Sequence, residues 1–465
     1  MELDRVLAYC DEKFPDFIED LKELVKIPSV SFPGFPGEKM HDSALGVKVA
    51  LEKAGLQNVE ILELPEVHPY VFGEYIVSPD APTLLLYAHH DVQPPMREQL
   101  WRTPAFEATE VDGRLYGRGA ADDKGGIIVH TAAIECYLKT AATLPLNVKV
   151  IIEGEEECGS EHLFEFISRY KSKLQADALV MTDGANYDTG VPAITTSLRG
   201  VCILDCTVSA LDHPLHSGLW GGPLPDPIMA LSRLLSSLVD EKGELSVPGL
   251  CETIIEPGEE ELQGFASLGF TDEVFRKQSG ILDGVELLGA NKSIPYRLWR
   301  KPSLVINAIE SGDRKNAGSV VMDSAWARLG IRIVPGMDEK KSMQILKEHL
   351  QKNAPWGVKV DLKEKGFCGA WVCPLAEHQE FFSSSKEALS KGFDRDAVYI
   401  GCGASIPFVE PFSKALGGVP ALLVGVEDPY TNAHGENESL HLGDFKKAIK
   451  SEIHLFNLLA QTMKK

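Results

Sequence analysis

The stretch Pro82-Thr-Leu-Leu-Leu-Tyr-Ala88, which runs directly into His89-His-Asp91, decides the fold. Its first part is short and nearly all apolar, which is typical of a strand buried on both faces of a sheet. Similar runs occupy residues 146–153 and 178–182, and stretches of helical length and periodicity lie at 126–141 and 161–174. This alternation predicts an α/β fold with a mostly parallel sheet and helices on both faces.

The domain organisation follows from where this alternation stops, after about Leu198. Segments 201–210 and 325–334 alternate apolar and polar residues, and a long, acidic, loop-rich stretch separates them. A chain of 465 residues is longer than one core usually supports, so a second domain of α+β type, inserted into the first, is expected here. The parallel pattern then resumes and ends in a helix. The predicted domains are 1–197 and 369–465 for the catalytic domain and 198–368 for the insert.

The composition is that of an ordinary globular protein, with 44% hydrophobic and 25% charged residues. The formal net charge of −22 argues against nucleic-acid or acidic-membrane partners, because both would repel such a surface. The first residues lack the layout of a secretory signal, and no apolar run is long enough to span a bilayer. We therefore expect a cytoplasmic protein with a small-molecule substrate and with its nine cysteines reduced.

The first candidate for chemistry is the pair His89 and Asp91, directly after the apolar strand. Ligands of open α/β sheets bind at the carboxyl ends of strands. Because side chains alternate along a strand, His89 and Asp91 share one side while His90 lies on the other, so Asp91 can hold the imidazole of a metal-binding His89. Taken alone, the pattern favours a structural histidine.

The second candidate is Asp122-Asp123, where the glycine-rich turn Tyr116-Gly-Arg-Gly-Ala120 leads into a predicted helix. One interpretation is helix capping, since Asp is a preferred N-cap residue. A phosphate-binding loop is disfavoured, because Gly-x-x-x-x-Gly-Lys-Ser/Thr is not matched and two adjacent acids would repel phosphate. The remaining interpretation is a carboxylate that bridges two cations.

Acidic and histidine residues follow three further predicted strands. The run Glu155-Glu-Glu157 ends the strand at 146–153; such a run is usually a solvated surface, but here one carboxylate can bind metal while its neighbour acts as general base. Asp183 and His434 follow two later strands. Together these clusters indicate a two-metal site whose His, Asp and Glu ligands suit Zn²⁺, with Mn²⁺ or Co²⁺ as alternatives.

These residues, in this order, resemble the di-metal exopeptidases and deacylases that include aminoacylase, carboxypeptidase G and acetylornithine deacetylase. The resemblance extends from His89 to His434 and so covers most of the chain. The carnosinase and cytosolic nonspecific dipeptidase branch is the most similar. The motifs that carry this similarity are Tyr116-Gly-Arg-Gly-Ala120, His216-Ser-Gly218, Ile331-Arg-Ile-Val-Pro335 and Ser405-Ile-Pro407.

The resemblance implies a role for each residue of the site. Asp122 bridges the two metals, Glu156 is the general base, and Asp91 orients a histidine ligand. Glu155 is then left as a solvated neighbour. A hydroxide that bridges the metals attacks the scissile carbonyl. The remaining ligands form two pairs, one for each metal: His89 with Asp183, and Glu157 with His434.

The resemblance also implies substrate-binding residues. Arg332 binds the substrate's C-terminal carboxylate, and Ser405 adds a hydrogen bond. His216 stabilises the developing oxyanion; in the family it often comes from the partner subunit, which implies a homodimer and an insert that acts as lid and dimerisation domain. A loop histidine and a surface ion pair are the alternatives for His216 and Arg332.

One departure from the family concerns the substrate side of the site. Related dipeptidases commonly show Arg-Glu-Gly-Gly-Ser-Ile-Pro, whereas this chain has Gly401-Cys-Gly-Ala-Ser-Ile-Pro407. Cys158 also stands where Ser is common. The predicted metal ligands are untouched by these differences, but the substrate preference becomes an open question.

The sequence thus predicts a metal-dependent hydrolase that cleaves dipeptides or similarly small peptides. An N-acyl amino acid deacylase, of the acetylornithine deacetylase or succinyl-diaminopimelate desuccinylase type, would use the same metal site. The long insert and the Ser405 motif favour dipeptides over that alternative. A non-catalytic binding protein of the same fold is disfavoured because Glu156 and the ligand set are intact.

Overall fold

The chain divides into two compact units in the computed structural model, which describes residues 2–289, 291–315, 317–406 and 408–463. Unit 1 comprises Met1–Thr196, Cys373–Ile400 and Phe408–Lys465. Unit 2 comprises Ser197–Val372 and Gly401–Pro407. Unit 1 is therefore discontinuous in sequence.

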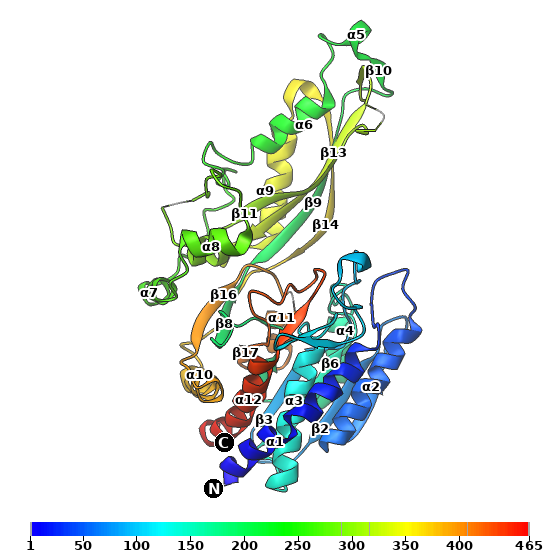
Figure 1. Cartoon of the computed structure of the whole chain (residues 1–465). Helices are drawn as coiled ribbons and strands as arrows, with labels where there is room; N and C mark the ends of the chain where they lie inside the picture. The colour runs from blue at the N-terminus through cyan, green and yellow to red at the C-terminus, as the bar shows by residue number, and fades with distance from the viewer. Residues whose placement is uncertain (1, 290, 316, 407, 464–465) are drawn as a thin grey trace. The chain divides into compact units, whose positions relative to one another are not determined.

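The sheet of unit 1 has a parallel centre with antiparallel strands on either side. Its strands are β1 (Gln57–Leu62), β2 (Tyr70–Tyr75), β3 (Thr83–His89), β6 (Asn147–Glu153), β7 (Ala178–Met181), β8 (Ala193–Leu198) and β17 (Ala421–Leu423). They lie in the order β1-β2-β6-β3-β7-β17-β8 (Figure 1). Two further strands, β15 (Trp371–Val372) and β16 (Val398–Cys402), both pair with β8 and complete a sheet of nine strands. β3 pairs in parallel with β6 and β7, and β17 with β7, whereas β2 and β8 pair antiparallel with their neighbours. All residues of β7 and β17 are buried, which explains their nearly all-apolar sequences.

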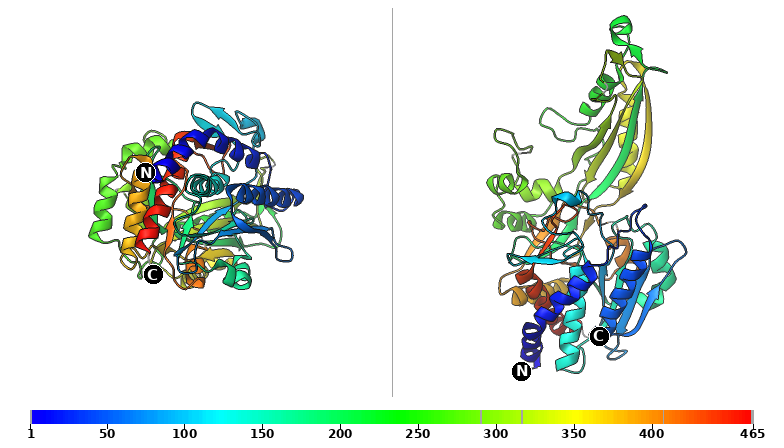
Figure 2. Two further views of the ribbon diagram at one scale, coloured as in Figure 1. Left: turned by 90° about the horizontal axis from the view of Figure 1, so that it is seen from below. Right: turned by 45° about the vertical axis from the view of Figure 1, so that its right-hand side comes forward.

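Helices cover both faces of this sheet. They are α1 (Glu2–Val25), α2 (Glu38–Ala54), α3 (Lys124–Thr140), α4 (Leu163–Leu174), α10 (Gln379–Phe393), α11 (Val409–Ala415) and α12 (Leu442–Thr462). α3 contacts β3 and is packed among α1, α2 and α12, so it is buried almost all round. Elsewhere on the sheet, Tyr70 stacks on Phe166 of α4, and Tyr87 contacts Phe412 of α11. The view from below shows the strands between these helices (Figure 2).

A small second sheet in unit 1 joins two segments that are far apart in sequence. Its strands are β4 (Thr109–Val111), β5 (Arg114–Tyr116) and β18 (Ser439–His441), with Ser439 opposite Tyr116. Asp122 follows β5, and His434 precedes β18. This pairing therefore brings the glycine-rich turn close to the chain that carries the late histidine.

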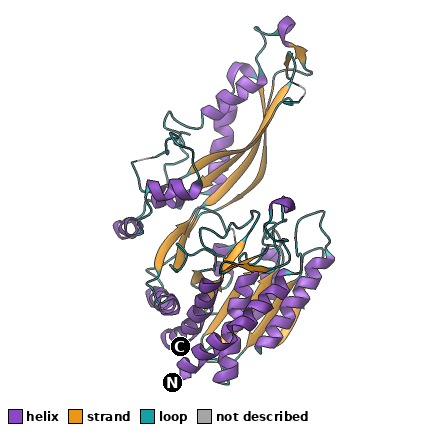
Figure 3. Cartoon of the chain, in the orientation of Figure 1, coloured by secondary structure: helices purple, strands orange, loops and turns teal. Residues whose placement is uncertain are grey.

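Unit 2 contains an antiparallel sheet with helices packed on it (Figure 3). Its strands are β9 (Gly200–Ser209), β11 (Ser303–Glu310), β13 (Ser324–Ile333) and β14 (Lys359–Cys368), in the order β11-β13-β9-β14. Every second residue of β9 and β13 is buried, and these residues form a core with α6 (Pro227–Ser236) and α9 (Glu339–Lys352). The polar alternation of the sequence arises because the other face is less covered. The predicted fold class, a mostly parallel α/β sheet plus an α+β insert, is confirmed.

Shorter elements complete the two units. They are β10 (Leu215–His216), β12 (Val320–Val321), β15 (Trp371–Val372), β16 (Val398–Cys402), α5 (Ser217–Trp220), α7 (Glu259–Ser267), α8 (Asp272–Ser279), and the single turns Glu98–Leu100, Tyr296–Arg300 and Pro355–Gly357. Within the described ranges, no helix has both the length and the apolar character that crossing a bilayer requires.

Candidate metal centre

His89 lies fully buried at the carboxyl end of β3, between two carboxylates. Its Nδ1 is 3.1 Å from the backbone oxygen of Asp91 and 3.4 Å from the carboxylate oxygen Oδ1 of the same residue. Its Nε2 is 3.1 Å from Oδ1 of Asp122. A ring whose Nδ1–H donates to Asp91 presents Nε2 as a metal ligand, which is the usual arrangement. His90 points elsewhere, with Nε2 2.9 Å from the oxygen of Pro69, as the strand alternation predicts.

Asp122 is shared by two groups of potential ligands. The first group is His89, Asp122 and Asp183; the second is Asp122, Glu157 and His434. Within each group the ligand atoms lie within 4.8 Å of one another. Nε2 of His434 is 3.1 Å from Oδ2 of Asp122 and 3.2 Å from Oε2 of Glu157. The structure thus gathers all the side chains predicted as metal ligands into one cluster, with Asp122 at its centre.

Asp91 also positions the turn that carries the predicted general base. Its Oδ1 accepts the backbone N–H of Glu156 at 3.2 Å, and its Oδ2 accepts that of Glu157 at 2.9 Å. The hydroxyl of Ser31 donates to Oδ2 at 2.7 Å. One buried carboxylate therefore contacts the ring of His89 and fixes the backbone after β6.

Asp123 does not act as the helix cap that the sequence allowed. It occupies the N-cap position of α3, but its side chain accepts no hydrogen bond from the helix. Instead, the hydroxyl of Thr182 donates to its Oδ2 at 3.1 Å. Asp122 and Asp123 therefore separate, the first toward the histidines and the second toward the residue before Asp183.

The prediction that Glu155 is a solvated neighbour is wrong. Its side chain is buried, and its Oε1 accepts hydrogen bonds from the hydroxyl of Tyr70 at 2.9 Å and from the backbone N–H of His162 at 3.1 Å. Tyr70 belongs to β2, which pairs with β6. Because the sequence did not reveal β2, it gave no sign of a donor that could satisfy a buried carboxylate there.

The cluster holds more buried carboxylates than its two histidines can neutralise. Burial, together with the charge of Asp122, raises the pKa of Glu157 to about 7. Burial raises the pKa of Asp183 to about 6 and, with the charge of Asp183, holds that of Glu156 well above its ordinary value. Hydrogen bonds that the His434 ring donates to the carboxylates of Asp122 and Glu157 raise the pKa of His434 to about 11. Such an excess of negative charge is what bound cations relieve, so these residues fit a pair of divalent ions.

The predicted substrate-binding residues all lie in unit 2, where two of them meet. Nη1 of Arg332, on β13, donates to Oγ of Ser405 at 2.8 Å. His216 lies opposite Val320 of β12, just before β13 begins, whereas Arg332 is near the end of β13. At about 3.3 Å per residue, the start of β13 at Ser324 lies roughly 25–30 Å from Arg332, and His216 pairs with Val320, which precedes that start. The structure therefore brings Arg332 and Ser405 together and leaves His216 apart from them.

Gly401 stands where related dipeptidases commonly have arginine. The space next to it is occupied by Trp299 and Ser197. A Cβ atom at Gly401 would lie 2.6 Å from Cβ of Trp299 and 2.7 Å from Oγ of Ser197. Such approaches are too close for any larger residue without movement of Trp299, which is itself buried. Gly401 therefore packs closely against Trp299 and Ser197, in the loop that carries Ser405.

Among the residues that contact the site, Ser31, Gln93 and Thr182 were not predicted from the sequence. Nε2 of Gln93 donates to Oε2 of Glu157 at 2.8 Å, and Ser31 and Thr182 contact Asp91 and Asp123 as described. Gln93 lies two residues after Asp91, and Thr182 directly precedes Asp183. Their closeness to predicted site residues in the sequence could have indicated that they contact the site. Ser31 precedes β3 by a long segment and carries no local signal.

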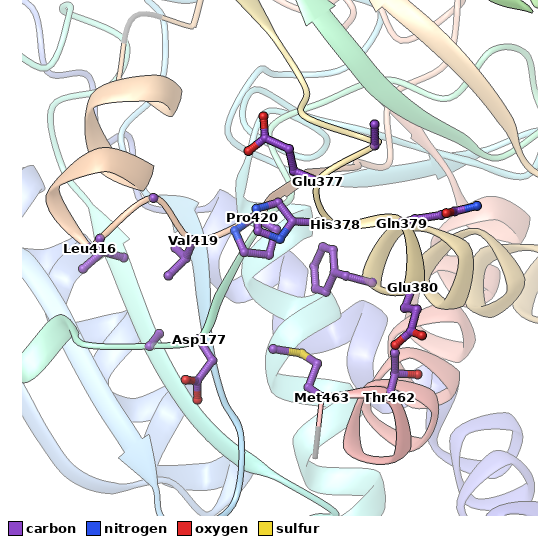
Figure 4. Close-up of a pocket in the computed structure, with 15 residues that line it drawn as sticks. Asp177, Glu377, His378, Gln379, Glu380, Leu416, Val419, Pro420, Thr462 and Met463 are labelled. Carbon is purple, nitrogen blue, oxygen red and sulfur yellow. The ribbon is translucent and has the colours of Figure 1, made fainter. Parts of the chain in front are cut away.

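A separate cavity of about 770 Å³ lies elsewhere in unit 1 (Figure 4). It contains His378, Glu377 and Glu380, and Asp177 at the amino end of β7. The backbone N–H of Thr83 donates to the carboxylate of Asp177 at 2.9 Å. None of the predicted site residues lines this cavity, so it is distinct from the metal centre.

Comparison with known proteins agrees with this geometry. The model of peptidase family M20/M25/M40 matches residues 85–457. The chain is 32% identical over 430 residues to the cysteinylglycine-S-conjugate dipeptidase of Corynebacterium striatum, covering 91% of this chain and 90% of that one. It is 30% identical over 478 residues to the Beta-Ala-His dipeptidase of Homo sapiens, covering 99% and 93%.

A solved structure shows the same architecture along the whole chain. The dipeptidase Dug1p from Saccharomyces cerevisiae is similar with a TM-score of 0.85 and 26% identity, and the match covers 99% of each chain. The resemblance to the carnosinase and dipeptidase branch is confirmed. The chain belongs to peptidase family M20/M25/M40.

Proposed function

We propose that this chain is a two-metal dipeptidase, which cleaves the peptide bond of dipeptides or similarly small peptides. The observation that carries the proposal is the sharing of Asp122 between two groups of potential ligands, next to the turn that bears Glu156. The names of the relatives, a cysteinylglycine-S-conjugate dipeptidase and a Beta-Ala-His dipeptidase, support a dipeptide substrate.

The proposed ligands are the residues of the two groups, with Asp122 common to both. Imidazole and carboxylate ligands without thiolate suit Zn²⁺, with Mn²⁺ or Co²⁺ as alternatives. When bound, a pair of such ions polarises the scissile carbonyl and makes water a stronger nucleophile. The side chain of His434 is 59% exposed, so the cluster is open to solvent on the side of this residue.

The chain's own residues handle the protons and the substrate. Glu156 accepts the proton of the attacking water and returns it to the leaving amine, as a general base and acid does. Asp91 positions both Glu156 and His89. Arg332 and Ser405 bind the substrate's C-terminal carboxylate: because Oγ of Ser405 accepts from Arg332, its own hydrogen can be donated to that carboxylate.

The proposed assembly is a homodimer in which His216 serves the partner's site. The wide separation of His216 and Arg332 along β13 supports this, because one dipeptide cannot touch both within a single unit 2. In the part of the chain that the structure describes, β11 pairs with β13 alone and exposes Val305 and Ile309. Leu219 of α5 is exposed as well, so apolar surface is available for a second copy.

The proposed location is the cytoplasm. The nine cysteines are all free thiols, and each of them is buried or half-buried. Free thiols of this number are typical of a reducing compartment.

The deciding experiment for the activity is a substrate panel. Metal-depleted protein is assayed with Zn²⁺, Mn²⁺ or Co²⁺ on dipeptides, including Cys-Gly and β-Ala-His, and on N-acetyl amino acids under the same conditions. We expect metal-restored cleavage of at least one dipeptide. Failure with every dipeptide, or turnover of N-acetyl amino acids alone, would reject the proposal.

The dimer is tested by mixing two inactive variants, His216→Ala and Arg332→Ala. If His216 acts across the interface, each mixed dimer contains one intact site, and random exchange restores about a quarter of the parent activity. Sedimentation equilibrium gives the oligomeric state independently. A mixture that stays inactive although mixed dimers form would show that His216 does not act in this way.

A further inference from the structure

Arg118 and Glu438 form a buried ion pair next to the metal centre. Nη1 of Arg118 donates to Oε2 of Glu438 at 2.7 Å, and both side chains are about 1% exposed or less. The guanidinium also lies over the ring of Trp101, 5.5 Å from its centre. Neither residue belongs to the groups of potential metal ligands.

The carboxylate of Glu438 holds the backbone of the glycine-rich turn. Its Oε2 accepts the N–H of Gly119 at 3.0 Å. Its Oε1 accepts the N–H of Ala121 at 3.0 Å and that of Asp122 at 3.2 Å. The turn is therefore wrapped around this carboxylate, and the backbone of the shared ligand Asp122 is fixed by it.

The guanidinium of Arg118 holds two other segments. Its Nη2 donates to the backbone oxygen of Gly435 at 2.9 Å and to that of Pro94 at 3.2 Å. Gly435 follows His434, and Pro94 ends the segment that begins at His89. The pair thus contacts the three segments that carry His89, Asp122 and His434.

A role in stability alone would not explain where these hydrogen bonds go. A buried ion pair is often no more stabilising than apolar residues of similar size, so burial is a weak reason to place one here. The backbone groups bound by Arg118 and Glu438 nevertheless belong to segments that bear potential ligands. Groups that orient metal ligands in this way act on metal affinity.

We infer that Arg118 and Glu438 are a positioning pair, which holds the segments of His89, Asp122 and His434 in register and thereby sets the affinity for both metal ions. The inference rests on the proposed two-metal function. Loss of either residue is expected to weaken metal binding by about 10- to 100-fold, as loss of groups behind metal ligands commonly does.

The test compares Glu438→Gln and Arg118→Lys with the parent protein. Gln keeps one acceptor oxygen but turns an NH₂ group toward N–H donors, and Lys keeps the charge but cannot reach Glu438, Gly435 and Pro94 at once. Metal-depleted proteins are titrated with Co²⁺, and binding is followed by the visible absorption of the bound ion. Circular dichroism confirms that each variant is folded; if Glu438→Gln does not fold, Arg118→Lys carries the test.

The matched control is Glu452→Gln. Glu452 is also a buried carboxylate, and it contacts Nδ1 of His130 at 2.8 Å, but it joins α12 to α3 and contacts none of the three segments. We expect its cobalt affinity to equal that of the parent within about twofold, even if its stability falls.

The outcomes separate this inference from the function on which it rests. Weaker cobalt binding in both variants, but not in Glu452→Gln, supports the positioning pair. The double variant should lose little more affinity than the worse single variant, because the two residues act as a unit. Affinities of Glu438→Gln and Arg118→Lys within about twofold of the parent would overturn the inference. A parent protein that binds no cobalt would instead overturn the proposed function.

Discussion

The backbone N–H of Glu157 donates to Oδ2 of Asp91 over 2.9 Å, although 66 positions separate the two residues. The same carboxylate faces Nδ1 of His89. A single side chain thus links a potential ligand at the end of β3 with the turn after β6. Changes to this carboxylate are therefore expected to affect both metal binding and the chemistry.

Replacing Asp91 by Asn should weaken metal binding by about 10- to 100-fold. The amide would present one acceptor oxygen where the carboxylate has two, and it would turn an NH₂ group toward the donors of Ser31, Glu156 and Glu157. Titration of the metal-depleted protein measures the effect. Ser31→Ala, which removes one donor and keeps the contact with His89, is the control and should change the affinity by less than about threefold. Equal affinities in Asp91→Asn and the parent would contradict the orienting role of Asp91.

Replacing Glu156 by Gln should lower kcat by about 10²- to 10⁴-fold, because the general base is lost. Metal content should stay close to that of the parent, since Glu156 is in neither ligand group. The measurements are steady-state kinetics on the best dipeptide and metal analysis of the purified protein.

The neighbouring substitution Glu155→Gln is the control for Glu156. Glu155 bonds to Tyr70 and His162, so its change should reduce stability while kcat stays within about threefold. If Glu155→Gln abolished turnover and Glu156→Gln did not, the general base would have to be reassigned.

The buried amine of Lys124 should make the stability of the metal-free protein rise with pH. Burial lowers the pKa of Lys124 to about 7, and its Nζ donates to the oxygens of Leu24 and Ile27. The unfolded chain keeps its proton up to about pH 10.4, so between about pH 7 and 10 it binds more protons than the folded chain. The free-energy cost of burying the charged amine of Lys124 is fully present below about pH 7, and it disappears as the pH rises toward about 10.

Lys124→Met isolates this contribution. From pH 7 to pH 9 the parent should gain about 2 kcal/mol in free energy of unfolding relative to the variant, at about 1.4 kcal/mol per pH unit. Urea unfolding at both pH values measures the difference. If the parent and the variant differed in free energy of unfolding by the same amount at pH 7 and at pH 9, Lys124 would not titrate in this range.

Adding a methyl group at Gly401 should destabilise the packing of unit 2 and leave the metal affinity of the centre unchanged. The Cβ atom of Gly401→Ala would meet Trp299 and Ser197, and overpacking of this kind costs about 1–3 kcal/mol. Because Ser405 lies on the same loop, kcat/KM for dipeptides should fall while cobalt affinity stays unchanged. Gly366→Ala, whose Cβ would meet no atom within 4 Å, is the control and should behave like the parent. A fully stable and active Gly401→Ala would contradict the packing described for Trp299.

Local sequence patterns predicted much of the architecture, because they report burial directly. The apolar runs of β3, β6 and β7 and the alternation of β9 and β13 each reflect how many faces of the strand are covered. The carboxyl ends of the parallel strands then located the candidate site. The resemblance, not the pattern, distinguished Asp122 from Asp123 and Glu156 from its neighbours.

Long-range pairing accounts for what the sequence could not reveal. Glu155 looked solvated because its donor, Tyr70, is contributed by a strand that has no clear signal of its own. Arg118 and Glu438 are 320 positions apart, and nothing near either residue indicates the other. The roles of the ligands, of Glu156 and of His216, Arg332 and Ser405 remain predictions until the experiments above are done.

The position of Asp122 has a consequence for how the centre can evolve. Its Oδ1 faces His89 and its Oδ2 faces His434, so one short, rigid group serves both halves. Any rotation of the Asp122 carboxylate that brings one oxygen closer to its histidine moves the other oxygen away from the second histidine. If Asp122 bridges two ions as proposed, neither ligand group can be changed alone, and a different metal preference would have to arise through surrounding residues that leave this carboxylate in place.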